Sequence, residues 1–186
     1  MTLPEVRVII DEVDAQIKPL FLKRMECATC VAEAKAKTGA DVFAPKRECE
    51  IIEGATADVD ASVREEYAAF LRHLMSVSRQ YQYGKLTDMQ DKVIAAALDA
   101  AALDGEIPHT RIEIRFSCDR TNSNLNLFIN MVNLNGVIID RMTLETRDDR
   151  QWIDMVLEGN IKTANIRQLL CQLGKEAKDF AIQALR

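Results

Sequence analysis

The spacing of apolar residues over residues 5–37 is the feature that most limits how this chain can fold. Apolar side chains recur there at intervals of four and three, at Val6, Ile10, Val13, Ile17, Leu20 and Phe21, then at Ala28 and Val31. This rhythm predicts one long amphipathic helix with a coiled-coil-like seam. Pro19 inside the segment predicts a local kink or a break, and Gly39 predicts the end of the helix.

Two further helices are predicted in the first half, over residues 45–53 and residues 61–83. The second carries an apolar side made of Val63, Tyr67, Phe70, Leu71, Leu74, Val77 and Tyr81. Three helices of such unequal length cannot close a good core within one chain, so we expect a partner chain. Residues 1–86 are therefore predicted to form an all-α, three-helix domain in a dimeric bundle.

The apolar rhythm becomes mixed beyond Pro108. Residues 111–118 alternate strictly, as in a strand with one buried face, formed by Ile112, Ile114, Phe116 and Cys118. The pattern then predicts, in order, a helix over 123–136, strands over 137–146 and 152–159, a helix over 163–177 and a strand over 180–185. This βαββαβ order predicts an α/β sandwich over residues 107–186, and an α+β, two-domain chain as a whole.

An alanine-rich helix is predicted to connect the two domains over residues 87–106. Thr87 and Gln90 have the spacing of a capping box at its start, and Gly105 is expected to follow its end.

Composition excludes several functional classes. The 186 residues carry a net charge of −5, without the basic balance of a nucleic-acid-binding protein. No apolar run approaches the roughly 20 residues of a membrane span, and the N-terminus lacks the basic region of a secretory signal. We therefore expect a cytoplasmic protein with no nucleic-acid or membrane partner.

The five cysteines fit a reducing compartment. Cys27 and Cys30 form a single CxxC inside a helical stretch, where ordinary helix packing is the favoured reading over a metal or redox site. Cys49, Cys118 and Cys171 lie in amphipathic patterns and are predicted to be small core residues.

Basic residues on the long helix form a candidate anion site. Arg24 and Lys35 are 11 positions apart, which returns them to nearly one face, roughly 16 Å apart along the axis. Ala28 and Val31 lie between them and would provide an apolar floor. Arg7 lies too far along and around the helix to join them in its own chain, but in an antiparallel dimer it would reach the site of the partner chain.

Further polar residues accompany these cations. The helix that starts at Pro45 has the poor cap Ala44 and basic residues in its first turn, which suits a site completed by an anion. Arg47 and Glu48 lie there, and Ser78 and Gln82 face one way on the third helix. From helix geometry alone, ordinary solvated charges remain the alternative.

The spacing Arg7–x16–Arg24–x10–Lys35–x11–Arg47–Glu48, followed by Ser78–x3–Gln82, resembles the all-α chorismate mutase family over residues 1–86. One position departs, because Ala44 stands where the family often has an acid. The resemblance implies the rearrangement of chorismate to prephenate, in the synthesis of phenylalanine and tyrosine, without metal or cofactor.

The resemblance also implies a role for each polar residue. Lys35 and Gln82 would donate to the ether oxygen of chorismate, and Glu48 would accept a hydrogen bond from the ring hydroxyl. Arg24, Ser78 and Arg7 of the other chain would bind the two carboxylates of the substrate, and Arg47 would add positive field.

The second half resembles an ACT-type regulatory domain, which often binds an amino acid. This resemblance implies a possible phenylalanine or tyrosine effector near Ser123, Asn124 and Leu125, where a helix begins. A dimerisation module without a ligand is the alternative for this half. For the whole chain, the alternatives are an isochorismate pyruvate lyase and a non-catalytic metabolite sensor that regulates a partner enzyme.

Overall fold

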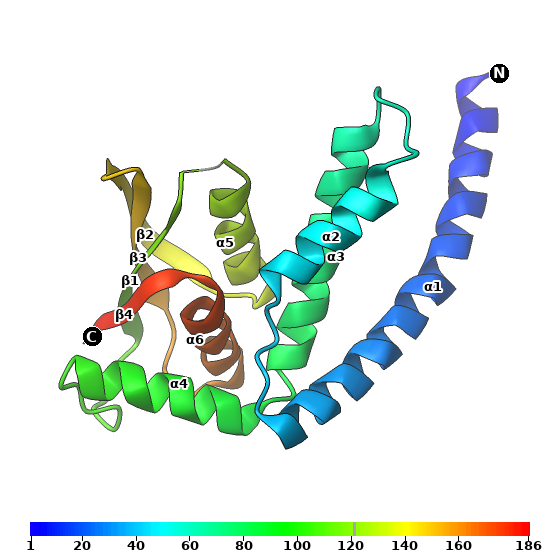
Figure 1. The fold of residues 1–186 in the computed structure, drawn as a ribbon. Coiled ribbons are helices and arrows are strands. Elements are labelled where there is room, and N and C mark those ends of the chain that lie inside the picture. The colour runs from blue at the N-terminus through cyan, green and yellow to red at the C-terminus, as the bar shows by residue number, and fades with distance from the viewer. Residues whose placement is uncertain (121) are drawn as a thin grey trace.

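The computed structural model describes the backbone of residues 1–120 and 122–186, and the side chains of residues 1–120 and 125–186. Helices and strands follow one another as α1 (Leu3–Thr38), α2 (Pro45–Thr56), α3 (Arg64–Tyr83), α4 (Thr87–Ala100), β1 (Arg111–Asp119), α5 (Asn122–Leu134), β2 (Ile138–Arg147), β3 (Arg150–Glu158), α6 (Ala164–Glu176) and β4 (Lys178–Leu185) (Figure 1). Within the described residues, no helix has both the length and the apolar character needed to cross a membrane.

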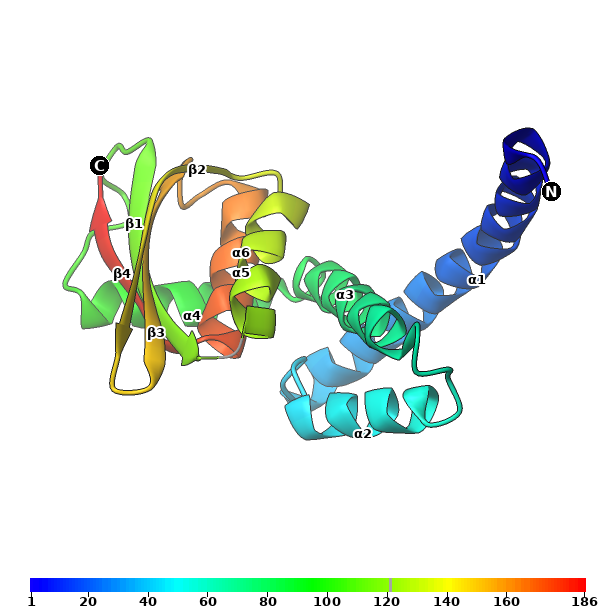
Figure 2. The ribbon, with the colours of Figure 1, turned by 90° about the horizontal axis from the view of Figure 1, so that it is seen from above.

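The predicted long helix is α1, which runs unbroken for 36 residues. The break expected at Pro19 does not occur; instead the helix bends smoothly along its length (Figure 1). Gly39 ends it as predicted, in the left-handed conformation (φ 70°), with its N–H donating to the Lys35 carbonyl at 2.8 Å. The first half of α1 stands away from α2 and α3 in both views (Figures 1 and 2).

Many apolar side chains of the helical region are exposed. They include Val8, Val13, Ile17, Leu20 and Leu22 of α1, and Tyr67, Phe70 and Tyr81 of α3. The side of α3 that is buried in this chain carries mostly small and polar residues instead, namely Ala68, Ser76, Ser78, Arg79 and Gln82, with Met75 and Tyr83. The apolar side predicted for α3 is thus only partly covered in the single chain, since Leu71, Leu74 and Val77 are half-buried.

The C-terminal region has the predicted βαββαβ order. β1 pairs antiparallel with both β3 and β4, and β2 pairs with β3, so the strand order is β2-β3-β1-β4. This is a split β-α-β sandwich, in which α5 and α6 lie side by side on one face of the sheet (Figure 2). The face predicted for β1 is confirmed, because Ile112, Ile114, Phe116 and Cys118 are all buried in the core under these helices.

The connecting helix α4 differs from its prediction at both ends. Thr87 is its first residue rather than its cap, and the Gln90 side chain donates to the Tyr83 carbonyl at 2.7 Å, so no capping box forms. The helix ends at Ala100, earlier than Gly105 predicts, and Ala102 takes the left-handed conformation (φ 52°). Ile94 of α4 belongs to the core of the sandwich, so this helix is also a packing element.

The helical region packs directly against the sandwich. Tyr83, Leu86 and Cys171 form a buried cluster with Val42, which joins α3 and α6 to the segment that follows α1. Gln168 of α6 donates to the Gln80 carbonyl of α3 at 2.7 Å. The boundaries at residues 86 and 106 remain a prediction, but the two regions share a well-packed contact.

Candidate active site

The contact between α1 and α3 brings Arg24 next to the third helix. Ala28 and Ala32 are 4% and 1% exposed, because their small side chains allow α3 to pack closely. The Arg24 guanidinium donates to the Leu74 carbonyl of α3 at 3.4 Å. Val31 was predicted to share the apolar floor with Ala28, but it is 42% exposed, and Ala32 takes that place.

Lys35 lies farther along α1 than Arg24, near the point where the chain turns toward α2. Its ammonium donates to the Val42 carbonyl at 2.9 Å. Burial lowers the pKa of Lys35; the charges of Glu48 and Asp41 oppose this shift, and that of Arg47 adds to it. Lys35 is therefore within electrostatic reach of both charged residues predicted on α2.

The start of α2 has the poor cap that the sequence predicts. Ala44 makes no side-chain capping bond. Arg47 is exposed, whereas Glu48 is half-buried and points toward the other helices. Burial also lowers the pKa of Arg24, and the charge of Glu48 again opposes the shift. One carboxylate therefore lies within electrostatic reach of both half-buried cations of α1.

Ser78 and Gln82 are both buried on α3, at 6% and 7% exposure. The Gln82 amide donates to the Ser78 carbonyl at 3.2 Å, while its Oε1 atom is buried without a hydrogen-bond partner. A half-turn of the amide would present its NH₂ group in place of that oxygen. Gln82 therefore has hydrogen-bonding capacity that a ligand can satisfy.

Arg7 is exposed on the first turns of α1, in the half of that helix that stands apart. Within the described chain it does not accompany Arg24 and Lys35. The prediction that Arg7 serves the site of a partner chain therefore stays a prediction.

Arg79 is a central residue of this region that our sequence reasoning did not assign. It is 3% exposed, and its Nη1 atom donates to both carboxylate oxygens of Glu48, at 2.6 and 2.5 Å. Its Nε atom donates to Glu176 of α6 at 2.8 Å, and the Phe43 ring lies 4.9 Å from the guanidinium. Burial by itself lowers the pKa of Arg79, but Glu176 and Glu48 outweigh this effect, so the pKa of Arg79 is raised. The only local sign of a role for Arg79 in the sequence is its position directly after Ser78.

Glu176 has a side chain with no exposed surface. Gln172 donates to its Oε1 atom at 3.1 Å, and its Oε2 atom is buried without a partner. Burial raises the pKa of Glu176, although Arg79 opposes this shift. The sequence holds no sign of this contact, since 97 positions separate Arg79 from Glu176.

A cavity of about 440 Å³ opens beside Lys35. Three more lysines line it, namely Lys85 near the end of α3, Lys92 of α4 and Lys175 of α6, with Asp88 as the only acidic lining residue. Lys175 pairs with Asp41 at 2.7 Å, and the other lysines leave a surplus of positive charge that favours anions near Lys35.

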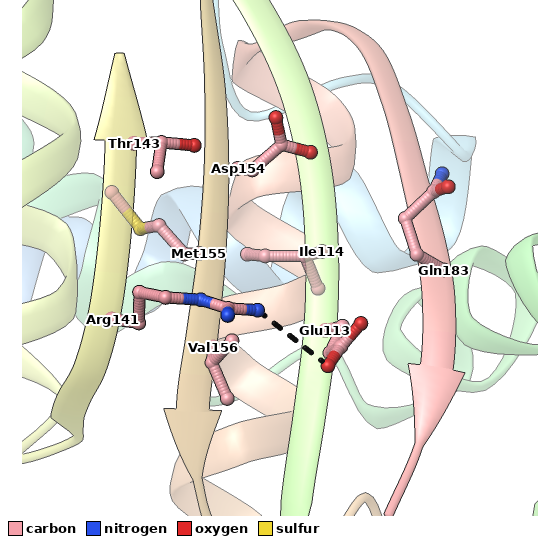
Figure 3. Close-up of a pocket in the computed structure, with 8 residues that line it drawn as sticks. All are labelled: Glu113, Ile114, Arg141, Thr143, Asp154, Met155, Val156 and Gln183. Carbon is pink, nitrogen blue, oxygen red and sulfur yellow. Dashed lines mark ion pairs between the residues drawn. The ribbon is translucent and has the colours of Figure 1, made fainter.

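A smaller hollow, of about 250 Å³, lies on the face of the sheet away from α5 and α6 (Figure 3). Arg141 of β2 reaches across β3 to Glu113 of β1, at 3.9 Å. Asp154 lies on the same face, so the charges are mixed. This hollow has no consistent charge for an anionic ligand.

The remaining predictions concern cysteines and the effector region. Cys118 and Cys171 are buried as predicted, but Cys49 is exposed, because it lies on the outer side of α2. Leu125 is half-buried and packs against the core of the sandwich. The side chains of Ser123 and Asn124 lie outside the described residues, so the effector site stays a prediction.

The helical region is similar to a known protein family. Residues 6–83, which extend from α1 to the end of α3, match the family described as Chorismate mutase type II. No significant match was found among curated proteins or among solved structures.

Proposed function

We propose that this chain rearranges chorismate to prephenate in the synthesis of phenylalanine and tyrosine, because residues 6–83 match the family described as Chorismate mutase type II. The observation that carries the proposal is a set of three contacts: Arg24 of α1 bonds to α3, Lys35 of α1 bonds to the segment before α2, and Glu48 of α2 bonds to α3. The buried pair Ser78 and Gln82 lies on the same third helix.

The rearrangement breaks an ether C–O bond and forms a C–C bond within one molecule, so it needs no nucleophile. Charge develops on the ether oxygen as its bond breaks, and donors aimed at that oxygen stabilise the transition state. Lys35 and Gln82 are the proposed donors. Lys35 keeps two N–H groups beyond its bond to Val42, and the Gln82 NH₂ group keeps one N–H beyond its bond to the Ser78 carbonyl.

The two carboxylates of chorismate require cations that hold the molecule in its reactive, compact conformation. Arg24 and Ser78 would bind one carboxylate and Arg7 of the partner chain the other, with Arg47 adding positive field. The lysine-lined cavity beside Lys35 supports the proposal, because its field favours the approach of a dianion. Glu48 would accept the hydrogen bond of the ring hydroxyl.

A homodimer is part of this proposal. It is supported by the uncovered apolar residues of α1 and α3, among them Ile17, Leu20 and Phe70, which a second chain would cover. The five free cysteines support a reducing compartment, so we place the activity in the cytoplasm.

Mixing Arg7→Ala chains with Lys35→Ala chains should regenerate activity that neither variant has alone. In a heterodimer, one of the two sites takes Lys35 from the first variant and Arg7 from the second, so that site is intact. Prephenate formation should therefore rise after subunit exchange. A heterodimer verified by differential tagging that shows no gain would mean that Arg7 serves its own chain.

The alternatives differ in their products. An isochorismate pyruvate lyase would use a similar set of cations and would release pyruvate, whereas a sensor would bind chorismate without converting it. Incubation of the full chain with chorismate and with isochorismate, followed by chromatography and mass analysis, separates the three. We expect prephenate from chorismate.

For the C-terminal sandwich we propose an ACT-like role, in which phenylalanine or tyrosine binds near the start of α5. The βαββαβ order supports this proposal, and so does the general ability of helix N-termini to bind a carboxylate. Binding should change activity through a coupling free energy of about 1–3 kcal/mol. Asn124→Asp should weaken binding, because it places negative charge against the carboxylate of the effector.

The measurement is calorimetry of the full chain with each amino acid, alongside kinetics with and without it. The full chain is needed because removal of residues 107–186 would expose Arg79 and Tyr83, which are buried against α6. Ser123→Thr is a matched control that adds no charge. If neither amino acid binds, the sandwich is a structural module.

A further inference from the structure

Arg79 joins two carboxylates that come from different halves of the chain. Glu48 belongs to α2 in the chorismate mutase domain, and Glu176 is the last residue of α6 in the sandwich. The guanidinium holds both at once, at 2.5 Å and 2.8 Å. Its fork geometry allows this, because Nη1 and Nε point toward different acceptors.

Only one member of this cluster reaches the surface. The side chains of Arg79 and Glu176 are 4% and 0% exposed, whereas that of Glu48 is 22% exposed. A carboxylate has about four lone-pair positions, so Glu48 can accept from Arg79 on its inner side and from a ligand on its outer side. The position of Glu48 therefore depends on groups that no ligand touches.

The charges of the cluster do not balance. One guanidinium serves two carboxylates in surroundings with little water, and the Oε2 atom of Glu176 has no hydrogen-bond partner. Each carboxylate therefore competes for the same cation. If Glu176 lost its charge, Arg79 would be left to Glu48 alone and would hold it more tightly on the inner side.

We propose that Glu176 of the C-terminal sandwich positions Glu48 for the substrate, acting through Arg79. This inference rests on the proposed function, in which Glu48 accepts the hydrogen bond of the ring hydroxyl. Arg79 and Glu176 are positioning residues, since neither touches the substrate. The C-terminal sandwich then contributes to the active site even without an effector, and a shift of α6 changes catalysis through this contact.

The test is a double-mutant cycle on kcat and KM for chorismate, measured with the full chain. Glu176→Gln should lower kcat/KM about tenfold in the wild-type background, within the range of coupling found in hydrogen-bonded networks. In a Glu48→Gln background the same change should have almost no effect, because the residue through which Glu176 acts has already been neutralised.

Asp91→Asn is the matched control. It also removes one carboxylate that pairs with an arginine of α6, Arg167, but that carboxylate is 66% exposed and lies outside the cluster. We expect kcat/KM to stay near the wild-type value in both backgrounds. Glu176→Asp is a second variant, which keeps the charge but withdraws it from Arg79, and it should act in the same direction as Glu176→Gln.

The outcomes separate the two proposals. If the wild-type chain forms no prephenate, the proposed function fails and the positioning role fails with it. If the wild-type chain is active but Glu176→Gln lowers kcat/KM equally in both backgrounds, the effect is general loss of structure and only the positioning role fails. Unchanged activity of folded Glu176→Gln and Glu176→Asp, with folding checked by circular dichroism, would overturn it in the same way.

Discussion

Lys35→Ala should lower kcat by roughly 10²–10³-fold, the usual cost of losing one donor to a developing oxyanion. KM should change much less, because the ether oxygen carries most of its negative charge only in the transition state. Steady-state rates of prephenate formation measure both constants. Lys37→Ala is the control, since Lys37 lies two residues further along the same helix and is exposed. A near-normal kcat in Lys35→Ala would remove Lys35 from the proposed mechanism.

Lys35 should also affect the pH dependence of kcat/KM. Burial lowers the pKa of Lys35 below its ordinary value, and only the protonated form is the cationic donor that the mechanism requires. The value of kcat/KM, which reports the free enzyme, should fall as pH rises. The fall should begin at a lower pH than it would for a lysine with an ordinary pKa. If deprotonation of Lys35 causes this fall, kcat/KM of Lys35→Arg should not fall in that pH range, because arginine keeps its proton throughout it.

Arg79→Met should lower the free energy of unfolding by about 3–5 kcal/mol, the usual effect of removing one partner of a buried ion pair. Methionine fills much of the space of the arginine stem, but it leaves the buried Glu176 without its cation and beside the negative charge of Glu48. Denaturant unfolding, followed by circular dichroism, gives the midpoint and the slope. Since folded proteins are stable by only about 5–15 kcal/mol, the variant should be close to its folding limit.

Arg115→Met is the matched control for this prediction. Arg115 also binds a carboxylate with two contacts, to Asp154 at 2.7 and 3.1 Å, but both side chains are well exposed. Its loss should cost only about 0–1 kcal/mol. Adding Glu48→Gln and Glu176→Gln to Arg79→Met should recover much of the lost stability, because no unpaired charge then remains buried. A cost of Arg79→Met no greater than that of Arg115→Met would contradict this explanation.

The order of helices and strands could be predicted from the sequence because most elements carry a clean apolar period. Apolar residues alternate strictly in β1 and recur every three or four residues in α1, so the local sequence indicates a strand and a helix. The match of residues 6–83 to the chorismate mutase family confirms the resemblance drawn from the spacing of Arg24, Lys35 and the later polar residues.

Two of the three misses arose because a contact with another part of the chain outweighed the local signal. Gln90 forms a bond to Tyr83 instead of a capping box with Thr87. The smooth course of α1 through Pro19 shows that one missing backbone bond does not interrupt so long a helix. Arg79 escaped notice because its partner Glu176 enters only when α6 packs against α3.

The projecting half of α1 should make the activity depend on protein concentration. A helix end with exposed Val8, Val13 and Ile17 has few contacts in its own chain to hold it in shape. In the proposed dimer, ordering this end and joining the second chain are therefore one event, and dilution reverses both. Specific activity would then depend on protein concentration, because dilution withdraws Arg7 from each site before any bond in the chain is broken.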